Sequence, residues 1–308
     1  MTATAAFDAR ARRIGVLCIV GSAVAFAIAP VFGKVAFAHG VDSLALLALR
    51  FGSAALLLWA VVAARSVRRG LELPPRATAL RILALGSLVL PGEVILYFTS
   101  LHHIGAGLAE VLLFLYPVWV VLITALGLRQ PVSALVVGCS VAAVAGAALT
   151  VGGVEGVDVV GVLLAVGASL GFAAYVVLSG RLVHGVGSLL TTVLVVSGAA
   201  VTFVVLALAT GSQGPTDAAG WAATAGLSVV GTVVSFLLLT AGLARMPSTD
   251  AAVISTVEPA VAVVLGAVLL GEQVAVVQVL GVVVVLGSVA FLVRQESRAE
   301  IVDPALGH

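Results

Sequence analysis

Long apolar stretches follow one another through almost the whole sequence, and they restrict the fold more than any other feature. An α-helix needs about 20 predominantly apolar residues to cross the hydrocarbon core of a bilayer. Ten stretches meet this requirement, and the sequence predicts a membrane-spanning helix in each. They are Ile14–Phe37, Ser43–Ala64, Ile82–Leu101, Gly105–Gly127, Val132–Val151, Val159–Arg181, Ser188–Thr210, Ala218–Leu243, Thr249–Gly271 and Val274–Val293. The predicted fold class is an all-α integral membrane protein with ten transmembrane helices.

The scarcity of charge leads to the same conclusion. Hydrophobic residues make up 62% of the chain and charged residues only 9%, whereas soluble domains contain about 25% charged residues. A water-soluble fold could not cover its surface with so few charges, so the lipid bilayer is the expected surroundings. The formal net charge of +1 argues against a nucleic-acid partner.

Positive residues between the stretches indicate the orientation. Loops that stay in the cytoplasm are enriched in Lys and Arg. If the N-terminus is cytoplasmic, thirteen of the fifteen Lys and Arg residues fall on that side, and the outer loops carry none. We therefore expect a multi-pass protein of the inner (plasma) membrane with both termini in the cytoplasm. Residues 1–13 and 294–308 would be cytoplasmic tails, the second without regular structure.

The two halves of the chain, 14–151 and 159–293, contain similar patterns at similar spacings. Gly15-Val16-Leu17 with Phe26-Ala27 matches Gly161-Val162-Leu163 with Phe172-Ala173, and Ala109 with Pro117 matches Ala251 with Pro259. Each half has five predicted helices. Because five is odd, the second half must enter the membrane from the opposite side. Inverted repeats of this kind are typical of secondary transporters.

On these residues the chain resembles the EamA-like transporters of the drug/metabolite transporter superfamily. The resemblance covers both repeats, and its clearest motifs are Leu49-Arg50-Phe51, Tyr116-Pro117-Val118, Glu258-Pro259 and Leu270-Gly271-Glu272-Gln273, with Lys34 in the first helix. One position departs from the family pattern, since Arg129-Gln130 stands where the first half would carry Gly-Glu. The resemblance implies a ten-helix carrier with a central cavity that usually exports amino acids or other small metabolites.

Five ionisable residues stand out inside the predicted spans: Lys34, Arg50, Glu93, Glu110 and Glu258. Such groups are costly in hydrocarbon and usually face a cavity or each other. Arg50 could hold a substrate carboxylate, or it could lock helices together, and its depth allows an ion pair with Glu110. Glu93 or Glu258 could bind an ammonium group or a proton. Lys34 is close enough to a helix end to reach the interface.

Prolines and tyrosines accompany these charges. Pro91, Pro117 and Pro259 each remove a backbone donor and are predicted to break their helices, and a broken helix with a carboxylate near mid-membrane is typical of a transporter site. Tyr97, Tyr116 and Tyr175 could form an aromatic wall for an amphipathic solute or simply pack between helices. We expect a cavity between the halves near Arg50, Glu93, Tyr116 and Glu258.

These features favour a secondary transporter. With the family resemblance, they predict an exporter of small metabolites such as amino acids that works by alternating access. Another solute or multidrug carrier and a channel-like facilitator are the alternatives.

The sequence has no nucleotide-binding Gly-Lys-Ser/Thr motif, so no cofactor is predicted. An enzyme is disfavoured because no His lies in the spans and Cys18 and Cys139 are isolated, which also argues against a metal site. Proton coupling and facilitated diffusion both fit, and the oligomeric state is left open.

Overall fold

A computed structural model describes residues 9–69, 73–151, 158–270 and 275–302, and helices dominate all four ranges. The helices are α1 (Ala9–Ala38), α2 (Ser43–Arg69), α3 (Arg76–Ala84), α4 (Leu90–Ser100), α5 (Ala106–Leu113), α6 (Tyr116–Leu122), α7 (Ala134–Val151), α8 (Val159–Val186), α9 (Ser188–Thr210), α10 (Ala218–Ser228), α11 (Ser235–Leu243), α12 (Ser248–Ser255), α13 (Val257–Leu270) and α14 (Val276–Val302). Three π-helical segments, Leu85–Val89, Ile123–Gly127 and Val229–Val234, interrupt the α-helical geometry.

Several of these helices join end to end into longer apolar rods. Within the described residues, nine rods are long and apolar enough to cross a membrane, and a shorter apolar helix covers Ala134–Leu149. These ten segments correspond in order to the ten predicted spans. Because Ala134–Leu149 is shorter than the other nine, the number of ten crossings remains a prediction. Several boundaries differ from the prediction, and two of them illustrate the difference. The third span begins at Arg76, and α14 continues as helix to Val302, where an unstructured tail was expected.

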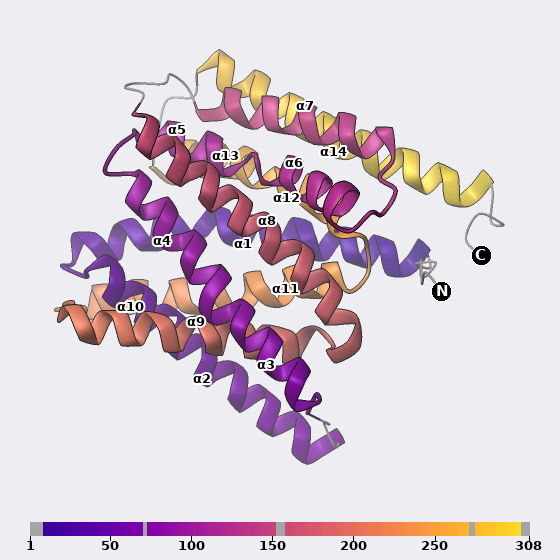
Figure 1. Cartoon of the computed structure of the whole chain (residues 1–308). Coiled ribbons are helices and arrows are strands. Elements are labelled where there is room, and N and C mark those ends of the chain that lie inside the picture. The colour runs from indigo at the N-terminus through magenta and orange to yellow at the C-terminus, as the bar shows by residue number, and fades with distance from the viewer. Residues whose placement is uncertain (1–8, 70–72, 152–157, 271–274, 303–308) are drawn as a thin grey trace.

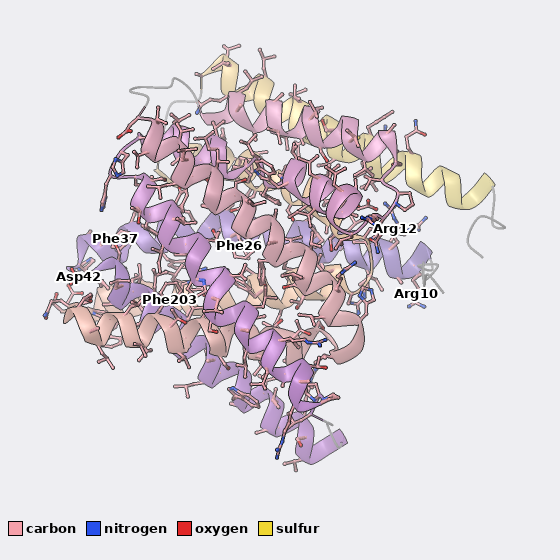
Figure 2. All side chains as sticks on the ribbon, in the orientation of Figure 1. Arg10, Arg12, Phe26, Phe37, Asp42 and Phe203 are labelled. Carbon is pink, nitrogen blue, oxygen red and sulfur yellow. The ribbon has the colours of Figure 1, made fainter. Side chains whose placement is uncertain are left out.

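The first helix gives the bundle a direction. Figure 2 shows Arg10 and Arg12 at one end of α1 and Phe37 and Asp42 at the other, with Phe26 and Phe203 between. We call these the Arg12 end and the Asp42 end of the bundle. The start of α1 and the finish of α14 both lie at the Arg12 end (Figure 1). The described chain therefore returns to the side from which it started, as an even number of crossings requires.

Helices of the two halves are interleaved. The most extensive packing joins α7 to α14, α2 to α9, α4 to α8, and α1 to α10 and α11 (Figure 1). Each of these pairs takes one helix from residues 14–151 and one from residues 159–293. The buried core consequently runs across the boundary between the halves and does not form a separate core in each.

Two glycines allow one especially close contact between the halves. A Cβ atom on Gly198 of α9 would stand 2.5 Å from the carbonyl oxygen of Leu83 and 2.7 Å from the amide nitrogen of Ser87. Opposite it, a Cβ atom on Gly86 would overlap the backbone of Val195. The backbones touch directly, as small residues permit in membrane helix packing.

This contact predicts that Gly198→Ala destabilises the protein by about 1–3 kcal/mol, because the added methyl group meets rigid backbone. Thermal unfolding of purified protein in detergent would measure the loss. Gly92→Ala is the matched control, since a Cβ atom there has no neighbour within 4 Å. An unchanged melting temperature for Gly198→Ala would show that the close approach does not exist in the membrane protein.

Candidate functional site

Three glutamates from both halves of the chain lie around Tyr97 inside the bundle, and we call Glu93, Glu110 and Glu258 the carboxylate cluster. Glu258 interacts electrostatically with Glu110. Tyr97 interacts with all three glutamates, and Glu93 also interacts with Arg50. The structure thus brings together five of the ionisable or tyrosine side chains that the sequence singled out. Tyr116, beside Glu258, and Tyr175, beside Glu93, complete the group.

Lys34 is the candidate that lies apart. It is exposed, in the last part of α1 towards the Asp42 end. This position agrees with a side chain that reaches the membrane interface.

The guanidinium of Arg50 is anchored to the opposite half. Its Nε donates to Thr232 Oγ1 at 2.6 Å, and an η nitrogen donates to the carbonyl oxygen of Gly231 at 2.7 Å. The guanidinium carbon also lies 5.1 Å from the ring centre of Phe51. Both acceptors belong to the π-helical segment Val229–Val234, whose wider turns alter the usual backbone pairing. Arg50 therefore locks α2 to this segment.

The ion pair that the sequence allowed between Arg50 and Glu110 does not form. Glu110 instead accepts a hydrogen bond from the Tyr97 hydroxyl at 2.7 Å, and Arg50 has Glu93 as its charged neighbour. The depths of Arg50 and Glu110 along their helices allowed an ion pair. The depth of a residue does not, however, determine the direction in which its side chain points. Glu93 is closely packed, because Gly171 of α8 lies against its Cβ atom.

Aromatic rings form a continuous chain beside the cluster. Tyr116 stands edge-on to Phe172 at 4.9 Å between ring centres, Phe172 stacks with Tyr175 at 6.0 Å, and Tyr175 contacts Phe236 at 5.9 Å. Phe236 continues the chain to Phe26 and Phe51. The sequence identified the tyrosines and missed these phenylalanines, which look like ordinary apolar residues in a membrane helix.

The predicted helix breaks occur at two of the three prolines. The fourth span breaks at Phe114–Leu115, just before Pro117, and the ninth breaks at Thr256, just before Pro259. Pro91 was expected to break its helix and does not. The rod continues through it, with the π-helical segment Leu85–Val89 immediately upstream.

Hydroxyl groups of the second half satisfy the carbonyls that two prolines leave without a donor. Proline at position i cannot donate to the carbonyl at i−4. The carbonyl of Ser87, four residues before Pro91, accepts from Thr202 Oγ1 at 2.7 Å. The carbonyl of Leu113, four residues before Pro117, accepts from Ser169 Oγ at 2.9 Å. These two hydroxyl donors satisfy the carbonyls of Ser87 and Leu113, as a bilayer core without water requires.

Among the residues that the structure describes, four buried polar atoms have no hydrogen-bond partner: Trp119 Nε1, Tyr175 Oη, Ser179 Oγ and Thr191 Oγ1. Tyr175 and Ser179 lie one turn apart on α8, near enough to interact but without good hydrogen-bond geometry. Buried polar groups are usually paired with protein or water. An unpaired hydroxyl beside Glu93 is thus available to a water molecule or a solute.

A groove of about 500 Å³ lies elsewhere, between α7 and α14. Its walls are small or apolar and include Gly138, Cys139, Gly287 and Phe291. None of its lining residues belongs to the carboxylate cluster. The cavity expected near Arg50, Glu93, Tyr116 and Glu258 remains a prediction.

Charged contacts join the two halves at both ends of the bundle. At the Arg12 end, Arg12 of α1 and Asp250 of α12 form a buried ion pair with N and O 3.5 Å apart. At the Asp42 end, His39 Nδ1 lies 2.6 Å from Asp217 and His103 Nδ1 lies 2.9 Å from Asp158. The Arg12–Asp250 pair was not predicted, because Arg12 belongs to a predicted tail and Asp250 lies at the edge of a predicted span.

The two aspartates at the Asp42 end, Asp158 and Asp217, also cap helices. Asp158 accepts from the amide of Val160 at the start of α8, and Asp217 accepts from the amide of Gly220 at the start of α10. These backbone hydrogen bonds, followed by those with the histidines, hold the pKa of both carboxyl groups below the usual range.

Arg50 anchoring predicts that Thr232→Val lowers stability by about 1–3 kcal/mol, because an N–H of the guanidinium loses its acceptor in a site without free water. Thermal unfolding in detergent measures the change. Thr224→Val is the matched control, since that buried hydroxyl bonds one turn back within its own helix, to Gly220. Equal effects of the two substitutions would contradict a special role for Thr232.

The capping geometry predicts a pH-dependent stability difference between wild type and Asp217→Asn. A carboxyl group whose pKa is lowered on folding stabilises the fold above its unfolded pKa, about 3.9, and loses that effect as the pH falls through its folded value. Asparagine can still cap the helix. The variant should therefore melt below wild type at pH 7, and the gap should close in acid. A gap that is independent of pH would refute the assignment.

The bundle, with ionisable groups held inside apolar helices, defines a polytopic membrane protein of the transporter class. The sequence profile of the EamA-like transporter family matches the chain twice, over residues 13–152 and 159–294. The protein therefore belongs to the EamA-like transporter family, within the drug/metabolite transporter superfamily.

Two individual comparisons agree with this family. The chain is 30% identical over 197 residues to a Bacillus subtilis (strain 168) protein named "Uncharacterized transporter YcbK", a match that covers 61% of this chain and 63% of the relative. It therefore spans somewhat less than two thirds of that relative. A solved crystal structure superposes with a TM-score of 0.78 at 20% identity, over 93% of this chain and 98% of the other. That likeness concerns the fold alone.

Proposed function

We propose that the protein is a secondary transporter that exports small metabolites such as amino acids by alternating access between two inverted repeats, residues 14–151 and 159–293. The carboxylate cluster is the observation that carries this proposal. Glu93 and Glu110 come from the first half and Glu258 from the second. A solute held between them would touch both halves, so a rocking motion could expose it to either side of the membrane.

Corresponding irregularities in the two halves support the repeat. The third span of each half contains a π-helical segment, Leu85–Val89 and Val229–Val234, and the fourth span of each breaks shortly before a proline. Irregular backbone is tolerated at membrane depth only where protein or a water-filled cavity satisfies it. Its recurrence next to the cluster is consistent with a binding site at the interface of the repeats.

The contacts at the two ends fit the role of gates. Arg12–Asp250 joins the halves at one end, and His39–Asp217 and His103–Asp158 join them at the other. Alternating access requires one set of contacts to separate while the other holds. The positive residues near the Arg12 end support the proposal that this end, and with it both termini, faces the cytoplasm and that the protein lies in the inner membrane. A transporter releases its solute chemically unchanged, so no enzymatic role is proposed.

Counterflow in proteoliposomes tests this function. Vesicles containing the protein would be loaded with unlabelled amino acids or other metabolites and given a labelled tracer outside, with and without a pH gradient. A carrier accumulates the tracer transiently and saturates, whereas a channel-like facilitator, the alternative, does neither. Failure of every solute in a broad metabolite panel would reject the carrier.

The cluster predicts that Glu93→Gln lowers the counterflow rate at least tenfold, because the substitution removes the acidic group beside Arg50 while keeping the shape. Asp42→Asn is the control, since this carboxylate is exposed and its bond is to the amide of Gln213. It should retain most of the rate. Normal transport by Glu93→Gln would remove Glu93 from the site.

A further inference from the structure

Negative groups outnumber positive ones inside the bundle. Between the two ends of the described spans, the cluster contributes three carboxyl groups and Arg50 contributes the one guanidinium. Lys34 is exposed near the Asp42 end, and the Arg12–Asp250 pair closes the opposite end. The interior therefore has an excess of acidic groups over basic ones.

Arg50 has little capacity left for an anionic ligand. Two of its donors are bound to Thr232 and Gly231, its face lies over Phe51, and Glu93 is its charged neighbour. A substrate carboxylate would be limited to the remaining N–H donors of Arg50, and it would have to approach the acidic groups of the cluster. The sequence allowed Arg50 to grip a carboxylate, and the contacts favour its structural role.

Glu258 differs from Glu93 and Glu110 in its exposure and in its hydrogen bonding. Glu93 is 8% exposed and packed against Gly171, and Glu110 is bound by Tyr97. Glu258 is partly accessible, and no hydrogen bond to its carboxyl group occurs in the described part of the chain. It occupies the first turn of α13, directly after the break at Thr256. The break thus presents a carboxyl group without a donor beside Glu110.

Aromatic faces lie next to this group. Tyr116 interacts with Glu258 and contacts Phe172, which stacks on Tyr175. Ring faces attract ammonium and similar cations, and a carboxylate in a low-dielectric site strongly favours a cation as partner. Acid and aromatic surface together suit a protonated amine attached to an apolar body.

We propose that Glu258 recognises the ammonium group of the substrate, and that the preferred solutes are small organic amines without a free carboxylate. This rests on the proposed transport function and narrows it. An amino acid would bind through its ammonium end, and its carboxylate would weaken binding.

Three ligands with nearly the same body test the proposal: tyramine, a cation; tyrosine, a zwitterion; and 3-(4-hydroxyphenyl)propionate, an anion. Binding to the full chain in detergent would be measured by calorimetry. Tyramine should bind at least tenfold more tightly than tyrosine, and the anion should not bind measurably. Equal binding of the anion, or no binding by any of a series of amines from ethylamine to tryptamine, overturns the proposal.

Variants test whether Glu258 is the residue that binds tyramine. Glu258→Gln should weaken tyramine binding at least tenfold, and Glu258→Asp should recover part of it. Glu110→Gln, which keeps an acceptor for Tyr97, should lose less. Elution volume and melting temperature would establish that each variant is folded. Tyramine affinity within twofold of wild type in Glu258→Gln refutes the role of Glu258.

The two proposals fail in different ways. Amine binding without counterflow by any solute would keep this inference and reject the transporter. Counterflow of acids, zwitterions and amines without preference would keep the transporter and reject the amine selectivity.

Discussion

The absence of water from the hydrocarbon core is the constraint on which the rest of the structure depends. Each backbone or side-chain polar group there must find a partner within the protein. Helices satisfy the backbone, and the exceptions are informative. The carbonyls freed by Pro91 and Pro117 receive hydroxyl groups from α9 and α8, and Arg50 receives two oxygen atoms from the segment Val229–Val234. These cross-connections hold the two halves in register.

The same constraint gives the interior charges their meaning. An ionisable group in a membrane helix is costly unless it is paired or reaches a hydrated space. Arg50 and Glu110 meet that condition through neighbours, whereas Glu258 has electrostatic neighbours without a hydrogen-bond donor. A group of this kind persists where its chemistry is used, which is why we propose solute recognition at the interface between the two halves.

Hydropathy was sufficient to predict the helical spans, since apolar length is what insertion into a bilayer requires. Four of the five ionisable residues that stood out in the predicted spans lie inside the bundle, whereas Lys34 is exposed. Hydropathy could not predict their partners, because Thr232 and Gly231 come from the other half and look unremarkable in the sequence. Pro117 and Pro259 accompany breaks as expected, whereas the helix continues through Pro91, directly after the π-helical segment Leu85–Val89. The π-helical segments have no sequence pattern that hydropathy detects.

The hydroxyl groups that compensate the prolines also bear on how the chain is made. A ribosome synthesises α4 and α6 well before Ser169 and Thr202 exist. The nascent first half would thus enter the bilayer with two backbone carbonyls still waiting for their donors, and it reaches its final form only after α8 and α9 arrive. Biosynthesis of the two halves is therefore a sequential process in which the later half completes the earlier one.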